Sequence, residues 1–206
     1  MARTLMLVAA MLAGAALVTG ARGQEPQPGF LGRPLAEARE SGFFVWFHLT
    51  ETASAVDAKG GRLVSYKPSG PRFHDLTTLQ VAVDGRDNVQ RMDLWLLRAF
   101  IESGGNAPFA RDIAKSFLAA APPADDASAL ASLAAEIEHR LGPSERVIVG
   151  PGYVKPELPP EPSQGYACYA GTREAYRQDL AHSRLEMRNE AGPDGLGLRL
   201  SLIATQ

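Results

Sequence analysis

The chain has 206 residues and a formal net charge of −2, with 45% hydrophobic and 21% charged residues. This composition is that of an ordinary globular protein, and it excludes a disordered chain, a collagen and a polytopic membrane protein. The single cysteine excludes an intrachain disulfide framework and a cysteine-rich zinc module.

The first 23 residues have the pattern of a secretory signal peptide. Arg3 gives a positive start, residues 5–20 are apolar and uncharged, and Ala21 and Gly23 stand at −3 and −1 of a cut before Gln24. The alternative is an uncleaved anchor helix, but the apolar run is shorter than the roughly 20 residues that span a bilayer. No cysteine near the cut could receive a lipid. We therefore expect an exported protein, periplasmic or extracellular, with no stable membrane anchor.

The charge of the chain without its signal peptide limits the classes of partner that we expect. Cleavage would remove Arg3 and Arg22 and leave a more acidic chain without a basic run, which argues against nucleic acid and anionic membranes as partners. After the signal peptide (1–23) we expect a flexible leader over 24–36, which is rich in Pro, Gly and Gln. A single α+β domain should follow over 37–206, with a Pro-rich connection at 150–165.

The first part of this domain is expected to form strands. After a helical turn over 35–40, residues 43–49 (FFVWFHL) are aromatic on both alternating faces, as in a central strand that is covered on both sides. Residues 62–67 predict a second strand. Residues 76–83 alternate apolar and polar side chains and predict a half-buried third strand.

Three helices are expected next. The first covers 89–103 and has apolar residues around most of its surface. The second begins after Asn106, a favourable N-cap residue, and ends at Pro122. The third, over 125–141, has aspartates in its first turn, which suit the helix dipole, and Gly142 after its last turn.

The end of the chain again predicts mainly strands. A short strand is expected over 146–149 and another over 164–170, whereas 172–182 weakly favours a helix. A turn over 191–195 precedes leucines at alternate positions, which indicates a closing hairpin. The order of strands, helices and strands predicts an α+β fold, a mainly antiparallel sheet with a cluster of about three helices packed on it. The missing β-α-β alternation disfavours a doubly wound sheet.

Cys168 is the first candidate for catalysis, because a thiol becomes a nucleophile when a histidine such as His48 or His74 deprotonates it. No local signature of a cysteine hydrolase surrounds it, so a small apolar residue on the inner face of a strand is the competing interpretation. His74 and Asp75 resemble an adjacent pair of metal ligands, but matching helical ligands are absent and a loop pair explains them better.

Two further groups of residues carry metal-ligand atoms, but their spacing disfavours a metal site. His48 and Glu51 stand three apart, so on a strand their side chains would point to opposite faces. Asp84, Asp87 and Asn88 could offer oxygens to calcium, but the twelve-residue calcium loop is absent and a turn explains these residues better. The sequence also lacks the P-loop, the dinucleotide fingerprint, the nucleophile elbow and the zinc-protease motif. We therefore expect no metal and no cofactor.

Aromatic residues provide the candidates for binding. Trp46 could line a ligand cleft, and Tyr166 and Tyr169 could form a contact surface near the Pro-rich stretch. We expect an exported, non-catalytic domain that binds a small ligand or an envelope or secreted protein. The competing hypotheses are an exported hydrolase or thiol enzyme that uses Cys168 with a histidine, and a structural subunit of an envelope assembly.

Overall fold

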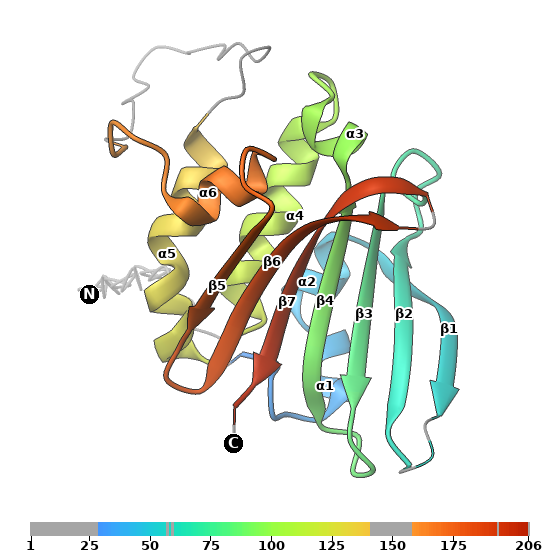
Figure 1. The fold of residues 1–206 in the computed structure, drawn as a ribbon. Helices are drawn as coiled ribbons and strands as arrows, with labels where there is room; N and C mark the ends of the chain where they lie inside the picture. The colour runs from blue at the N-terminus through green and yellow to red at the C-terminus, as the bar shows by residue number, and fades with distance from the viewer. Residues whose placement is uncertain (1–28, 57, 59, 141–157, 193, 206) are drawn as a thin grey trace, which may run out of the picture.

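Seven antiparallel strands form one sheet in the order β1-β2-β3-β4-β7-β6-β5, and helices lie on one of its faces (Figure 1). The computed structural model describes residues 29–56, 58, 60–140, 158–192 and 194–205. The strands are β1 (Leu49–Val56), β2 (Arg62–Pro68), β3 (Thr77–Val83), β4 (Val89–Leu97), β5 (Ala175–Asp179), β6 (Ser183–Gly192) and β7 (Gly195–Ala204). The helices are α1 (Leu35–Arg39), α2 (Gly42–Trp46), α3 (Arg98–Glu102), α4 (Ala107–Ala120), α5 (Ala124–His139) and α6 (Gln164–Tyr169). The described part of the chain is therefore an α+β fold, as predicted.

The pairing of β4 with β7 joins two halves of the sheet. Strands β1 to β4 form an antiparallel meander, and β5 to β7 form a second one after the helices. The two meanders meet where β4 and β7 pair antiparallel, with Leu94 opposite Leu200. Since parallel pairing is absent from the described ladders, no β-α-β crossover is needed.

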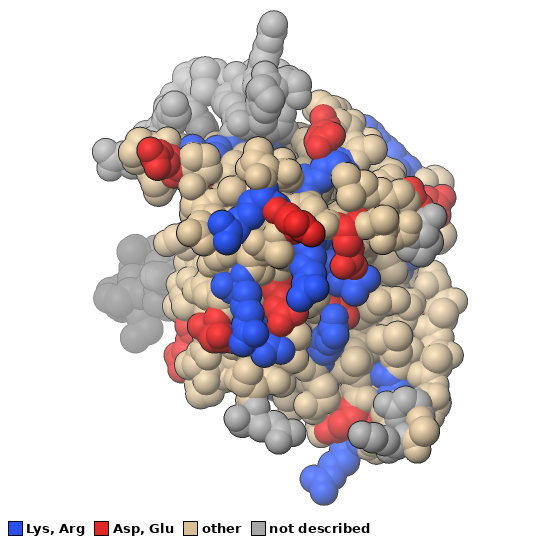
Figure 2. Space-filling model, viewed as in Figure 1, with Lys and Arg blue, Asp and Glu red and all other residues tan. Residues whose placement is uncertain are grey.

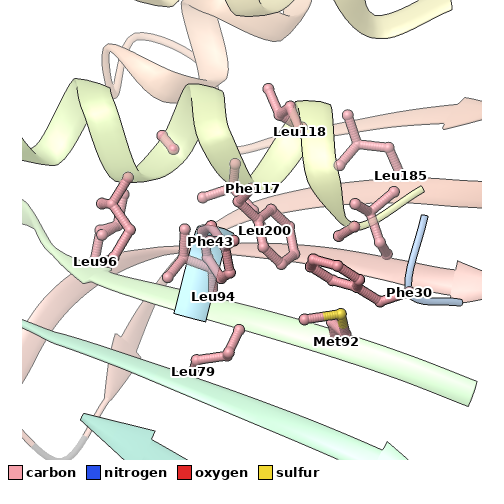
Figure 3. Packing of buried hydrophobic residues seen from close by; sticks show 14 of the residues in the cluster. Phe30, Phe43, Leu79, Met92, Leu94, Leu96, Phe117, Leu118, Leu185 and Leu200 are labelled. Atoms are coloured by element: carbon pink, nitrogen blue, oxygen red, sulfur yellow. The ribbon is translucent and has the colours of Figure 1, made fainter. Parts of the chain in front are cut away.

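The core lies between this junction and the helices. On β4 and β7, alternate side chains point to the helical face, and Phe117 and Leu118 of α4 pack onto them (Figure 3). The strand residues concerned are Met92, Leu94, Leu96, Leu198, Leu200 and Leu202, all fully buried. Because apolar burial is the dominant favourable term in folding, this layer stabilises the contact between the two meanders.

The helices α4 and α5 confirm two of the three predicted helices. Asn106 precedes α4, but its side-chain oxygen accepts a 2.7 Å hydrogen bond from Arg72 instead of capping the helix. In the first turn of α5, the buried Asp126 accepts hydrogen bonds from the His182 backbone N–H and, at 2.6 Å, from the Ser183 hydroxyl. This carboxylate therefore attaches the start of α5 to the β5–β6 turn.

The predicted strand over 43–49 is wrong, because residues 43–46 lie in helix α2 and β1 begins only at Leu49. The Ser41 hydroxyl accepts a hydrogen bond from the Phe44 N–H at the helix start, as an N-cap residue does. The buried side chains Phe43, Phe44 and Phe47 have the i, i+1, i+4 spacing of one helix face. Alternation along a strand would have buried Val45 as well, which is 61% exposed.

The predicted helix over 89–103 is also wrong over most of its length. Residues 89–97 form β4, and only 98–102 are helical, as α3. The same apolar residues fit both periods, because Met92, Leu94 and Leu96 also alternate with Arg91 and other non-core side chains. Pairing with β3 and β7 on both sides decides for the strand, since tertiary context overrides a weak local preference.

Two short segments nearer the C-terminus each have the opposite secondary structure to the one predicted. The predicted strand over 164–170 is helix α6, which begins where the Ser163 hydroxyl accepts a 3.1 Å hydrogen bond from the Tyr166 N–H. The predicted helix over 172–182 is instead the edge strand β5, which pairs with β6. Both segments are short, so local periodicity carries little information about them.

Other predictions are confirmed. The turn over 35–40 contains α1, the strands over 62–67 and 76–83 are β2 and β3, and the closing hairpin is β6–β7.

Residues 29–34, in the expected flexible leader, are packed rather than loose. Phe30 and Leu31 are buried, and both their N–H groups lie within 3.2 Å of the Ala121 carbonyl oxygen. The signal peptide, the strand over 146–149 and most of the Pro-rich connection lie outside the described residues. Within them, every helix is too short or too polar to cross a membrane.

The core predicts a clear contrast between two strand leucines. Leu94→Ala should destabilise the protein by about 2–5 kcal/mol because a fully buried side chain leaves a cavity. Leu196→Ala should change the free energy of unfolding by less than about 1 kcal/mol, because Leu196 is 56% exposed. Urea unfolding of both variants measures this, and similar losses at the two positions would contradict the described packing.

Candidate functional site

The residues proposed for thiol chemistry lie apart. Cys168 is buried in α6, and burial raises the pKa of its thiol, although Arg98 and Arg173 act in the opposite direction. Its sulfur lies 3.8 Å from the Glu174 carbonyl oxygen and 3.7 Å from the Asn189 amide nitrogen. No histidine is among the described contacts of Cys168, so the geometry supplies no base to form a thiolate.

The histidine–aspartate pair lies in the β2–β3 connection. His74 Nδ1 is 2.9 Å from Asp75 Oδ1, and Lys67 Nζ is 3.2 Å from the same oxygen. Hydrogen bonds from His74 and Lys67 lower the pKa of this exposed carboxyl. The interaction is a local surface network, and no third metal-ligating side chain joins it among the described residues.

The calcium candidates form a turn. The Asp84 carboxylate accepts hydrogen bonds from the backbone N–H groups of Arg86 at 2.8 Å and Asn88 at 2.9 Å. The bond from Asn88 contributes most to lowering the pKa of Asp84. These oxygens are thus used by the β3–β4 turn, as the alternative interpretation expected.

The tyrosines of α6 contact the end of α5 and the start of α3. The Tyr166 hydroxyl donates a 3.0 Å hydrogen bond to the Arg140 carbonyl oxygen, and the Arg140 guanidinium lies 5.4 Å from the Tyr166 ring centre. The carbonyl of Tyr169 accepts a 2.7 Å hydrogen bond from the buried Arg98. Both tyrosines are buried, so they connect helices rather than present a contact surface.

Trp46 and His48 lie together on the surface around α2. Trp46 is 77% exposed, and Val45 beside it is also exposed. His48 lies between α2 and β1 and has a positive φ of 48°. Val45 lines a hollow on one side of α2, and Trp46 lines another on the other side.

The first hollow, called here the β1 pocket, has a volume of about 460 Å³ and lies between α1, α2 and the first two strands. It is lined by Arg39, Phe44, Val45, His48, Leu49, Thr50, Glu51, Tyr66 and Ser69. Ligand pockets in proteins typically measure about 300–1,000 Å³. The β1 pocket therefore has the size of a binding site for a side chain or a small ligand.

An aromatic wall and one ion pair shape the β1 pocket. The ring of Tyr66 lies 5.1 Å from that of Phe44 in an edge-to-face contact. Arg39 donates a 2.8 Å hydrogen bond to the Tyr66 hydroxyl and forms a 2.5 Å ion pair with Glu51. Burial raises the pKa of Tyr66 above its ordinary value, the hydrogen bond from Arg39 only partly opposing it, so the phenol stays neutral and the pocket offers few unused charges.

The second hollow lies between α2 and α4 and has a volume of about 660 Å³. Phe43, Trp46 and Phe47 line one side, and Lys115 and Ala119 are among the residues of α4 on the other. The Lys115 ammonium is held 2.5 Å from Glu138 of α5. Most of the lining is apolar, and its polar residues Asp112, Lys115 and Ser116 all come from α4.

Beside the β1 pocket, β1 forms an edge of the sheet. It pairs only with β2 among the described strands, and seven of its eight residues are exposed. A bulge shifts its register between Glu51 and Ala53. Its outer row of backbone donors and acceptors is therefore open to solvent.

The sequence predicted only part of this region. Trp46 is a predicted binding residue, and His48 with Glu51 a disfavoured metal pair, whereas nothing in the sequence points to Arg39 or Tyr66. Arg39, Glu51 and Tyr66 come from α1, β1 and β2, and no sequence spacing links them.

Comparisons with known proteins do not identify the site. No protein family model, curated protein or solved structure matches this chain.

The buried position of Cys168 predicts its reactivity. In the native protein the thiol should react with Ellman's reagent far more slowly than an exposed cysteine, because it is inaccessible and its pKa is raised. After denaturation in guanidinium, the single thiol of each chain should titrate fully. Rapid reaction of the folded protein would contradict this and would restore the thiol-enzyme hypothesis.

Proposed function

We propose that this chain is a non-catalytic binding domain that takes an extended segment of another polypeptide along the outer edge of β1. The observation that supports this most strongly is the combination of an exposed edge strand with a pocket at its beginning. An added strand would satisfy the open backbone groups of β1, and the pocket would select one of its side chains.

The two edges of the sheet differ in the way that this proposal requires. At the opposite edge, β5 has only five residues, and its Arg177 and Asp179 form a 2.9 Å ion pair. Short, charged edge strands resist pairing with other chains. In contrast, β1 has eight residues and one charged side chain, Glu51, which is already paired with Arg39.

The walls of the β1 pocket favour an apolar side chain. Phe44, Val45 and Leu49 supply carbon surface, and Tyr66 holds its hydroxyl in a hydrogen bond. A charged side chain would lose hydration without gaining an unpaired counter-charge there, which costs free energy. The bound segment is thus expected to be extended and uncharged, with an aromatic or aliphatic residue at the pocket.

The signal-peptide pattern of residues 1–23 supports an exported protein. On this proposal the bound segment belongs to another envelope or secreted protein. An enzyme that uses Cys168 is not favoured, because no histidine contacts the thiol among the described residues.

Selection of random linear peptides displayed on phage tests the proposal. Peptides that bind the native chain should be apolar at alternate positions and should slow hydrogen exchange of the β1 amides. Ala55→Lys, which places a charge on this edge, should weaken their binding by about tenfold or more.

The matched control is Ala131→Lys, which introduces the same charge at an exposed position of α5. It should leave peptide affinity unchanged. Peptides that bind the Ala55→Lys variant as tightly as the native chain, or that protect a surface other than β1, would overturn the proposal.

A further inference from the structure

The sheet face opposite the helices has a dense pattern of charges over β4, β7, β6 and β5 (Figure 2). Most of these charges are paired locally. Each basic side chain has its own acidic neighbour in the pairs Arg91–Asp93 at 2.8 Å, Arg184–Glu186 at 2.9 Å, Arg177–Asp179 at 2.9 Å and Arg199–Glu190 at 2.7 Å. This face is therefore an ordered array of ion pairs rather than a random polar surface.

Arg188 is the exception. It is exposed, and no carboxylate pairs with it among the described residues. The β6–β7 register places Arg188 directly opposite Arg199. Like charges directly opposite each other on one sheet face repel and destabilise the pair, and the single carboxylate on Arg199, Glu190, does not neutralise both.

The two arginines border a small polar hollow. Its volume is about 140 Å³, and it is lined by Arg91, Glu186, Arg188, Glu190, Arg199 and Ser201. Drug-sized ligands need about 300–1,000 Å³, so this hollow suits one small charged group. Three guanidinium groups and two carboxylates line it, which leaves a positive excess.

The ion pairs around the hollow orient its donors. Arg91 is held by Asp93, which also accepts a hydrogen bond from the Ser201 hydroxyl. Glu190 holds Arg199 from the other side. Fixed guanidinium groups lose less entropy when they bind, and their planar forks match the oxygens of phosphate groups.

We propose that this hollow binds a phosphate group, which bridges Arg188 and Arg199 and removes their repulsion. Neither arginine belongs to the β1 edge, so this site is independent of the proposed peptide binding. The phosphate group could be inorganic phosphate or a phosphomonoester on a larger molecule.

Nuclear magnetic resonance titration of the native chain tests the site, with inorganic phosphate and O-phosphoserine as two probes at constant ionic strength. Both should shift the amide signals of residues 188, 199 and 201 saturably, and the tighter probe identifies the source. Chloride at the same ionic strength should not. Absence of saturable shifts with either probe up to about 10 mM would overturn the proposal.

Arg188→Gln should weaken phosphate binding by about tenfold or more, while Arg86→Gln, at an exposed arginine of the β3–β4 turn, should not change it. The melting temperature shows whether each variant folds and whether removing the repulsion between Arg188 and Arg199 stabilises it. Without phosphate, Arg188→Gln should melt at or above the native temperature, and phosphate should raise the melting temperature of the native chain only. An equal rise in the Arg188→Gln variant would contradict the site.

Discussion

The structure depends on the pairing of β4 with β7. These strands are far apart in the chain, and the helices α3 to α6 and the strands β5 and β6 lie between them. Their leucines and Met92 bury one continuous face against α4, so the free energy of forming the sheet and that of docking the helices are gained together. Closing this long connection costs chain entropy, which grows only slowly with loop length and is offset by the apolar burial.

One of the two proposed surfaces lies directly on this junction. Its outward residues, with those of β6, form the charged face on which Arg188 and Arg199 meet. On the helical side, Arg39 of α1 and Phe44 of α2 pack on Tyr66 of β2, which is buried, while all but one residue of the edge strand β1 are exposed. The β1 pocket is the space where the helical layer ends. The edge binds through backbone groups and apolar contact, whereas the face offers fixed charges, so the two suit different ligands.

The sequence predicted those elements whose local pattern agrees with their tertiary environment. α5 has clear end signals, and β3 and β7 alternate because one face is buried. The prediction from the sequence was wrong at β4, where the helical and the strand period fit the same residues, and at α2, where aromatic side chains suggested a strand. The α+β class survived these errors because the order of strands, helices and strands remained. For the site, Trp46 and His48 could be found as aromatic and ionisable residues in one segment, but the Arg39–Tyr66–Glu51 constellation and the Arg188–Arg199 opposition depend on pairings that local patterns do not encode.

Cross-strand nuclear Overhauser effects in the native protein test the central claim most directly, because they measure the pairing of β4 and β7 without any substitution. The account predicts backbone contacts in antiparallel register, with Leu94 opposite Leu200 and Met92 opposite Leu202. Pairing of β4 with a strand other than β3 and β7, or a register in which Arg91 and Arg199 no longer share one face, would contradict the fold and the phosphate site together.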